Sequence, residues 1–250
     1  MSRINSQRKS CKDVFNAFLV TMATYAGIFE FPCIEATFDI PNKLIAFSKC
    51  IPCKDYNQWV HFYEDDYQFE RLWRNPKKYL DILKRYKGVI LPDFSLYRDM
   101  PLVMQLWNIY RSRAIGCWLQ DNGIKVIPNI RFGDRRTYRI CCDGIEKHCV
   151  IAVGTHGNIK LVKEREIFLK GLDAIVKKLE PTVIVLYGSA PDKYFKKYMD
   201  VLHYLQCQFS FSSESLPSPD SNFCSWSCLS FKYIIKRNKY HIICGFCFKS

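Results

Sequence analysis

The sequence contains no uninterrupted apolar run of about 18 residues, which is the length that a membrane-spanning helix requires. Basic residues near the amino terminus are not followed directly by the apolar core of a signal peptide, because the first apolar cluster comes only at residues 18–20. These absences predict a cytoplasmic protein without a membrane partner.

Several catalytic fingerprints are also absent. The sequence has no serine nucleophile elbow, HExxH zinc motif, CxxxCxxC radical-cluster motif, Walker loop or dinucleotide-binding glycine pattern. Acidic residues are scarce, with 24 Asp and Glu against 37 Lys and Arg, and the net charge is +13. This excess favours an anionic small molecule or nucleic acid as partner, but its even spread along the chain also fits basic solvated surfaces.

The composition is that of a folded protein, with 48% apolar residues in a chain of 250. Its 13 cysteines are an odd number, and many stand in apolar segments where a reduced cysteine packs as a small hydrophobe. Two CxxC pairs, Cys50 with Cys53 and Cys244 with Cys247, contain the residue types of a four-cysteine zinc site. Their wide separation in the sequence favours reduced cysteines over zinc.

Apolar runs that end in polar and turn residues indicate the fold class. They occur at residues 60–66, 89–95, 126–131, 150–156 and 183–189, and more faintly at 206–211. Helical stretches lie between them, at 69–86 with an interruption at Pro76, at 100–120, at 163–179 and at 192–205. This alternation predicts an α/β protein of parallel βα repeats. A partial or full βα barrel is preferred because polar residues close every strand, and an open doubly wound sheet is the alternative.

The chain is expected to divide into three parts. Residues 1–58 form an irregular segment that caps the core, and residues 59–211 form the βα-repeat domain. Residues 212–250 are rich in cysteine and aromatic side chains and lack the βα rhythm, so they form either a small appended element or a poorly ordered tail.

The candidate site follows from the strand ends, because ligands bind at the carboxyl ends of parallel strands. Asp93 is the first catalytic candidate, since Pro92 fixes the end of its strand, and Asp134 and His156 are expected to assist it. The substrate-binding candidates are Ser95, Gln105, Asn129, Arg131, Thr155, Tyr187 and Ser189. Carboxylates with an Asn and a His also suit Mg²⁺ or Mn²⁺, whereas caps and turns are the structural alternative for each residue alone.

The motif Phe69-Glu70-Arg71 and the later segments DGIEK, AVGTHGNIK and VLYGSAPD carry a family resemblance. Over roughly residues 27–205, the chain resembles a bacterial and phage family that is catalogued only as a domain of unknown function and carries an F-D/E-R motif. The resemblance implies a bacterial, phage or mobile-element origin and supplies no established activity. The part after about Gln208 differs from the family's usual ending.

Two function classes remain. The first is an enzyme that acts on a phosphorylated or nucleotide-like substrate, with Asp93 as acid, base or metal ligand and Arg131 binding the anion. The second is a non-catalytic phage or mobile-element protein that binds nucleic acid or a host protein. A sugar-cleaving barrel with two carboxylates is less favoured because the arginines suit anions.

Overall fold

A computed structural model of the chain describes residues 13–205. Seven of the nine strands in this range form two parallel sheets. The first sheet contains β3 (Leu44–Ala46), β4 (Trp59–His61), β5 (Gly88–Ile90) and β6 (Val126–Ile127), and the second contains β7 (Val150–Gly154), β8 (Val183–Tyr187) and β9 (Leu202–Leu205). In both sheets the spatial order follows the order in the sequence, which is typical of consecutive βα units.

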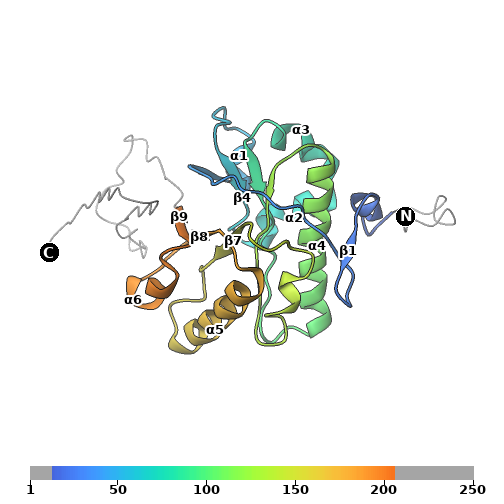
Figure 1. Ribbon diagram of the computed structural model, residues 1–250. Helices are drawn as coiled ribbons and strands as arrows, with labels where there is room; N and C mark the ends of the chain where they lie inside the picture. Colours follow the sequence, from blue (N-terminus) through green and yellow to red (C-terminus); the bar gives the residue numbers. More distant parts are fainter. Residues whose placement is uncertain (1–12, 206–250) are drawn as a thin grey trace, which may run out of the picture.

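Helices connect and surround the strands (Figure 1). The α-helices are α1 (Phe47–Cys50), α2 (Asp66–Arg74), α3 (Leu80–Leu83), α4 (Leu102–Asp121), α5 (Val162–Leu179) and α6 (Asp192–Phe195). The 3-10 helices are η2 (Ala17–Val20), η3 (Pro76–Tyr79), η4 (Ile140–Cys142) and η5 (Lys196–Tyr198). A short antiparallel hairpin, β1 (Tyr25–Ala26) with β2 (Phe31–Pro32), precedes the parallel strands and contacts α4.

The two parallel sheets are joined by an isolated bridge between Asn129 and Ala152. The Ile130 amide donates to the carbonyl of Ala152 at 2.8 Å, and the Ala152 amide donates to the carbonyl of Pro128 at 2.9 Å. At the other end of the strand series, Nε2 of His203 in β9 lies 3.0 Å from the carbonyl oxygen of Pro41, just before β3. The strand series is therefore continuous from β3 to β9.

The buried side chains alternate between two clusters, as the two-residue period of a strand requires. One cluster collects Leu44, Trp59, Ile90, Ile127, Val150, Ala152 and Val185 from six different strands. The alternate residues of β7 and β8, such as Ile151 and Ile184, belong instead to the larger cluster that includes the helices. In α5, Phe168, Leu172, Ile175 and Leu179 recur at helical spacing and supply its buried face.

The structure confirms an α/β protein with parallel strands joined by helices. Two boundaries differ from the sequence-based expectation. β3 lies within the segment expected only to cap the core, yet it pairs in parallel with β4. The stretch 192–205 was expected to be helical, but it contains only the short α6 and η5, and its last four residues form β9, which pairs with β8. The faint strand expected at 206–211 lies outside the described residues.

The broken helix at 69–86 was correctly predicted, because α2 ends at Arg74 and η3 begins at Pro76. Among residues 13–205, no helix combines the length and the apolar character needed to cross a membrane. The tail predicted at 212–250 falls outside the described part of the chain.

Candidate functional site

A cleft of about 650 Å³ lies at the carboxyl ends of β4, β5, β6 and β7. It is lined by Tyr63, Glu64, Asp65, Asp66, Tyr67, Gln68, Asp93, Ser95, Tyr97, Arg131, His156 and Gly157. A volume of this size is in the range of sites that bind small molecules, about 300–1,000 Å³. The cleft therefore occupies the position where parallel βα folds bind ligands.

Asp93 lies at the centre of a hydrogen-bonded network in this cleft. Nδ2 of Asn129 donates to Oδ1 of Asp93 at 2.7 Å, and Nη1 of Arg131 donates to Oδ2 at 3.3 Å. The hydroxyl of Tyr63 donates to Oδ1 of Asn129 at 3.0 Å, which fixes the orientation of the Asn129 amide. Three successive strand ends therefore contribute to one polar network.

The environment of Asp93 opposes its ionisation. Burial raises the pKa of Asp93 above its usual range, and the charge of Asp66 acts in the same direction. The charge of Arg131 and the hydrogen bond from Asn129 act in the opposite direction and lower the pKa. Only 12% of the Asp93 side chain is exposed, so the carboxyl is desolvated but still reaches the cleft. Such a carboxyl is suited to exchanging a proton with a ligand.

Tyr63 is held by two neighbours in the strand series. Its ring stacks on the ring of Tyr187 with centroids 4.5 Å apart. On β7, a Cβ atom added to Gly154 would lie 2.8 Å from the Tyr63 ring, so only glycine leaves room for that ring. Tyr187 was predicted to bind substrate directly, but its described ring contacts are with Tyr63 and His61, behind the cleft.

His61 lies on the same face of the chain as Tyr63, two residues earlier. The Tyr63 amide donates to Nδ1 of His61 at 3.1 Å, and burial lowers the pKa of His61 to about 3, so the imidazole is neutral. Neither His61 nor Tyr63 was among the candidates predicted from the sequence. Their alternation with Trp59 was a detectable signal, but an aromatic strand is more typical of core packing.

The loop that carries Asp93 is anchored from two helices. Asp66, at the start of α2, accepts hydrogen bonds from the amide of Ser95 at 3.1 Å and from its hydroxyl at 2.8 Å. From α4, Nδ2 of Asn108 donates to the carbonyl of Ser95 at 2.7 Å, and Nη2 of Arg111 donates to Oδ1 of Asn108 at 2.7 Å. Ser95, predicted to bind substrate, therefore also holds this loop.

The first two residues of the Phe69-Glu70-Arg71 motif attach α2 to this loop and to α4. Phe69 is fully buried, with its ring centroid 5.6 Å from that of Phe62 and 5.2 Å from that of Phe94. Glu70 accepts two hydrogen bonds from Nη1 of Arg111, at 2.8 and 3.0 Å. Phe94 follows Asp93 directly, so the motif supports the position of the candidate catalytic residue.

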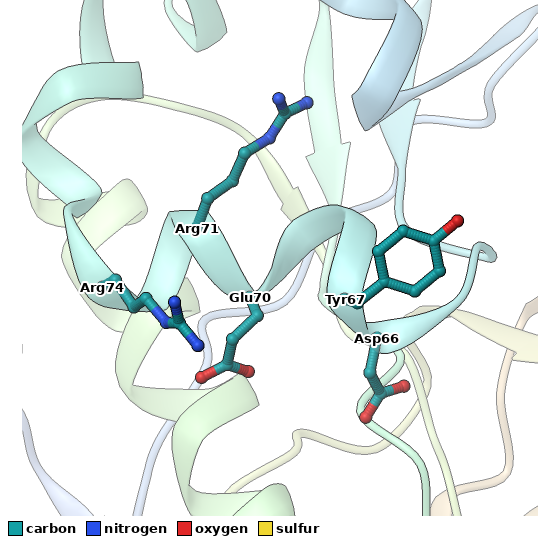
Figure 2. Close-up of a pocket in the computed structure, with 5 residues that line it drawn as sticks. All are labelled: Asp66, Tyr67, Glu70, Arg71 and Arg74. Carbon is teal, nitrogen blue, oxygen red and sulfur yellow. The ribbon is translucent and has the colours of Figure 1, made fainter.

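The third motif residue, Arg71, points to the other side of α2 from Glu70 (Figure 2). Its guanidinium lies 5.0 Å from the centroid of the Phe47 ring and 5.8 Å from that of Tyr79. A hollow of about 330 Å³ runs along this helix and is lined by Asp66, Tyr67, Glu70, Arg71 and Arg74. The side chains of Arg71 and Arg74 do not converge on one point in Figure 2. We therefore assign the Phe69-Glu70-Arg71 motif a structural role.

Buried polar residues lie directly beneath the network. Arg113 of α4 is almost fully buried, and its guanidinium donates to the carbonyl of Asn129 at 3.3 Å and to that of Cys141 at 2.7 Å. Burial lowers the pKa of Arg113 to about 10, which leaves it charged at neutral pH. Two further polar side chains of α4, those of Gln105 and Asn108, are buried as well.

Several predicted site residues lie away from the cleft. Asp134 forms an ion pair with Arg136 at 2.9 Å, which lowers the pKa of Asp134. Thr155 is buried, and its hydroxyl donates to the carbonyl of Tyr187 at 3.3 Å. Gln105 donates to the carbonyl of Met100 at 3.1 Å. Ser189 is exposed and does not cap α6, whose N-cap residue is Pro191. His156 does line the cleft.

Metal binding has little support within the described part of the chain. Residues 13–205 contain no group of three or more His, Cys, Asp or Glu side chains placed to hold a metal ion. Of the four cysteines considered for zinc, Cys244 and Cys247 lie outside that range. Cys50 is buried, which raises the pKa of its thiol to about 12. The carboxylates considered for Mg²⁺ or Mn²⁺ accept hydrogen bonds, Asp66 from Ser95 and Asp93 from Asn129.

Comparisons with known proteins show which family and which proteins the chain is similar to. The sequence profile of the family described as "Domain of unknown function (DUF4417)" matches residues 23–205. The Gene 1 protein of Mycobacterium phage L5 is 34% identical over 182 residues, which cover 71% of this chain and 78% of that protein. The Gene 1 protein of Mycobacterium phage D29 is 31% identical over 181 residues, which cover 70% and 66%. No solved structure matches.

Proposed function

The chain belongs to the DUF4417 family. From the geometry of its cleft we propose that it is an enzyme that uses Asp93 as a general acid or base. Its substrate is a small molecule with one anionic group, such as a phosphate of a nucleotide-like compound, which binds Arg131. The observation that supports this proposal most strongly is the environment of Asp93. Its carboxyl is desolvated at the cleft, has a raised pKa and is oriented by Asn129 and Arg131. His156, which also lines the cleft, is the second candidate for proton transfer.

Arg131 is suited to anchoring the anionic group. Only its Nη1 atom bonds to Asp93, and its Nε atom is buried without a partner among the described residues. A guanidinium presents several donors in one plane, so one edge can hold Asp93 while another binds a phosphate or carboxylate oxygen. This arrangement would place the anionic group of the substrate next to the catalytic carboxyl.

The negative charge of the side chains that line the cleft limits the class of substrate that can bind there. Glu64, Asp65, Asp66 and Asp93 line it, together with only one arginine. Nearby carboxylates repel a polyanion, so a nucleic-acid backbone is disfavoured in this cleft even though the whole chain carries a net charge of +13. A ligand with a single anionic group fits better. The net charge still supports the alternative, a non-catalytic protein that binds nucleic acid or a host protein through another surface.

We also infer that the two sheets curve into one barrel-like layer. The Asn129–Ala152 bridge joins them, six strands contribute to one inner cluster, and His203 meets the carbonyl of Pro41 beside the first strand. A barrel interior filled by alternate strand residues fits these observations. The curvature would bring Tyr63, Asp93, Asn129 and Arg131 to one mouth.

Replacing Arg131 by alanine is expected to weaken binding of inorganic phosphate or a mononucleotide by about 1.5–3 kcal/mol, the range for a hydrogen bond to a charged group. Titration calorimetry on the wild type and the variant measures this difference. Arg136→Ala is the matched control, because Arg136 is paired with Asp134 outside the cleft and should leave affinity unchanged.

A second titration with a short oligonucleotide separates the two function classes. Binding of small anions that depends on Arg131 supports the enzyme. If only the oligonucleotide binds, and its affinity is the same in the Arg131→Ala variant, the nucleic-acid-binding alternative replaces our proposal.

A further inference from the structure

We propose that the outer part of the cleft selects nucleoside monophosphates whose base carries an amine where uracil and guanine carry a carbonyl, as cytosine and adenine do. This inference rests on the proposed function and narrows its substrate class. The phosphate would bind Arg131 near Asp93, and the base would lie toward Asp65, Tyr67 and Tyr97, which line the same cleft.

Two tyrosines offer planar faces for a base. Tyr67 is 74% exposed and Tyr97 is 57% exposed, although large aromatic side chains usually bury most of their surface. Tyr67 comes from α2 and Tyr97 from the loop after β5, so the two rings belong to different elements. Nε2 of Gln68 donates to the Tyr67 hydroxyl at 2.6 Å, which restricts the ring. Exposed aromatic rings beside a phosphate-binding group are the usual means of holding a nucleobase.

Asp65 supplies the discrimination between bases. The carboxylates of Glu64, Asp66 and Asp93 accept hydrogen bonds from neighbouring side chains or amides. The exposed carboxylate of Asp65 makes no hydrogen bond or ion pair with another residue of the range 13–205. A free carboxylate accepts from the amine of cytosine or adenine, whereas the carbonyl that uracil presents at the corresponding position would be repelled.

The dimensions of the cleft favour a nucleotide over a simple anion. Its volume of about 650 Å³ is far larger than a phosphate ion needs and lies within the usual range for drug-sized ligands. Its acidic rim also favours a ligand that combines one anionic group with N–H donors, because the carboxylates can accept hydrogen bonds from these donors. A nucleoside monophosphate whose base carries an amine meets both conditions.

Calorimetric titrations of the full chain with CMP, UMP, cytidine and inorganic phosphate test the inference. CMP and UMP form a matched pair that differs at the amine. We expect CMP to bind at least about tenfold tighter than UMP, within the range for one good contact to a base edge. CMP should also bind tighter than cytidine, which lacks the phosphate.

The variant Asp65→Asn should bring the CMP to UMP affinity ratio close to one, because an amide both accepts and donates hydrogen bonds. Asp81→Asn, at an exposed position on α3, is the control and should keep the wild-type ratio. Thermal melts of both variants establish that the fold is intact.

Equal affinity of the wild type for CMP and UMP, or an unchanged ratio in Asp65→Asn, would overturn the inference. If phosphate and both nucleotides then still bound through Arg131, the proposed function would stand without this selectivity. If neither phosphate nor any nucleotide bound, both proposals would fail.

Discussion

Replacing Phe69 by alanine is expected to lower the free energy of unfolding by about 3–5 kcal/mol, the usual cost of truncating a buried phenylalanine. Phe69 is fully buried, and its ring packs against Phe62, just after β4, and Phe94, which follows Asp93. Losing this ring leaves a cavity between α2 and the strand ends. Urea denaturation at constant pH measures the change.

Tyr67→Ala is the matched control, because Tyr67 lies on the same helix but is mostly exposed. Its free energy of unfolding should change by no more than about 0.5 kcal/mol. If Phe69→Ala unfolded at the same urea concentration as this control, the motif would not have the structural role that we assign to it.

The substitution Asp93→Asn is expected to lower turnover by about 10²- to 10⁴-fold, the usual contribution of a general acid or base. It should not lower the melting temperature at pH 7. Burial raises the pKa of Asp93, so folding favours the protonated carboxyl and the ionised form costs stability. The amide of asparagine removes that charge and can still accept a hydrogen bond from Asn129.

The effect of Asp93→Asn on the melting temperature should change with pH in a defined direction. In the wild type, the stability contributed by protonated Asp93 is present below the ordinary carboxyl pKa of about 4 and is lost as the pH rises through the raised pKa. The melting temperature of Asp93→Asn, relative to wild type, should therefore be equal or higher at pH 7, and any advantage should shrink toward pH 4. A large destabilisation at pH 7 would identify Asp93 as a structural ion-pair partner of Arg131.

Local sequence patterns predicted the parallel strands and part of the site. Proline precedes Asp93 and Asn129 at the ends of two apolar runs, and both side chains meet in the cleft network. Arg131 follows two residues after Asn129 and reaches the same carboxyl. These residues were found because a buried strand that ends in polar residues is a short-range signal, and because neighbouring parallel strands end at one edge.

The remaining site residues depend on contacts that local patterns do not contain. Glu70 and Arg111 are 41 positions apart, and Tyr63 and Asn129 are 66 apart. Asp134 also follows a strand-like run, but it pairs with Arg136 two positions later and lies away from the cleft. Which polar residue meets a distant partner is decided by tertiary packing, and a single sequence does not show that packing.

The short strand β3 was the other difficulty. It has three residues, too few for its own pattern to show that it belongs to the parallel sheet. The pairing of β3 with β4 places it in the parallel sheet, although its surroundings in the sequence contain prolines and no helical repeat. Burial of Leu44 against Trp59 and Ile90 supplies the stabilisation that local propensity does not.

The central claim, that Asp93 is a desolvated acid–base residue at a ligand-binding cleft, is tested most directly by carbon NMR titration of its carboxyl group. The Asp93→Asn variant assigns the resonance. We expect the Asp93 signal to titrate at a pKa above the ordinary aspartate value, because burial outweighs the opposing effects of Arg131 and Asn129. A pKa at or below the ordinary value would contradict this claim and would identify the Asp93–Arg131 contact as a structural salt bridge.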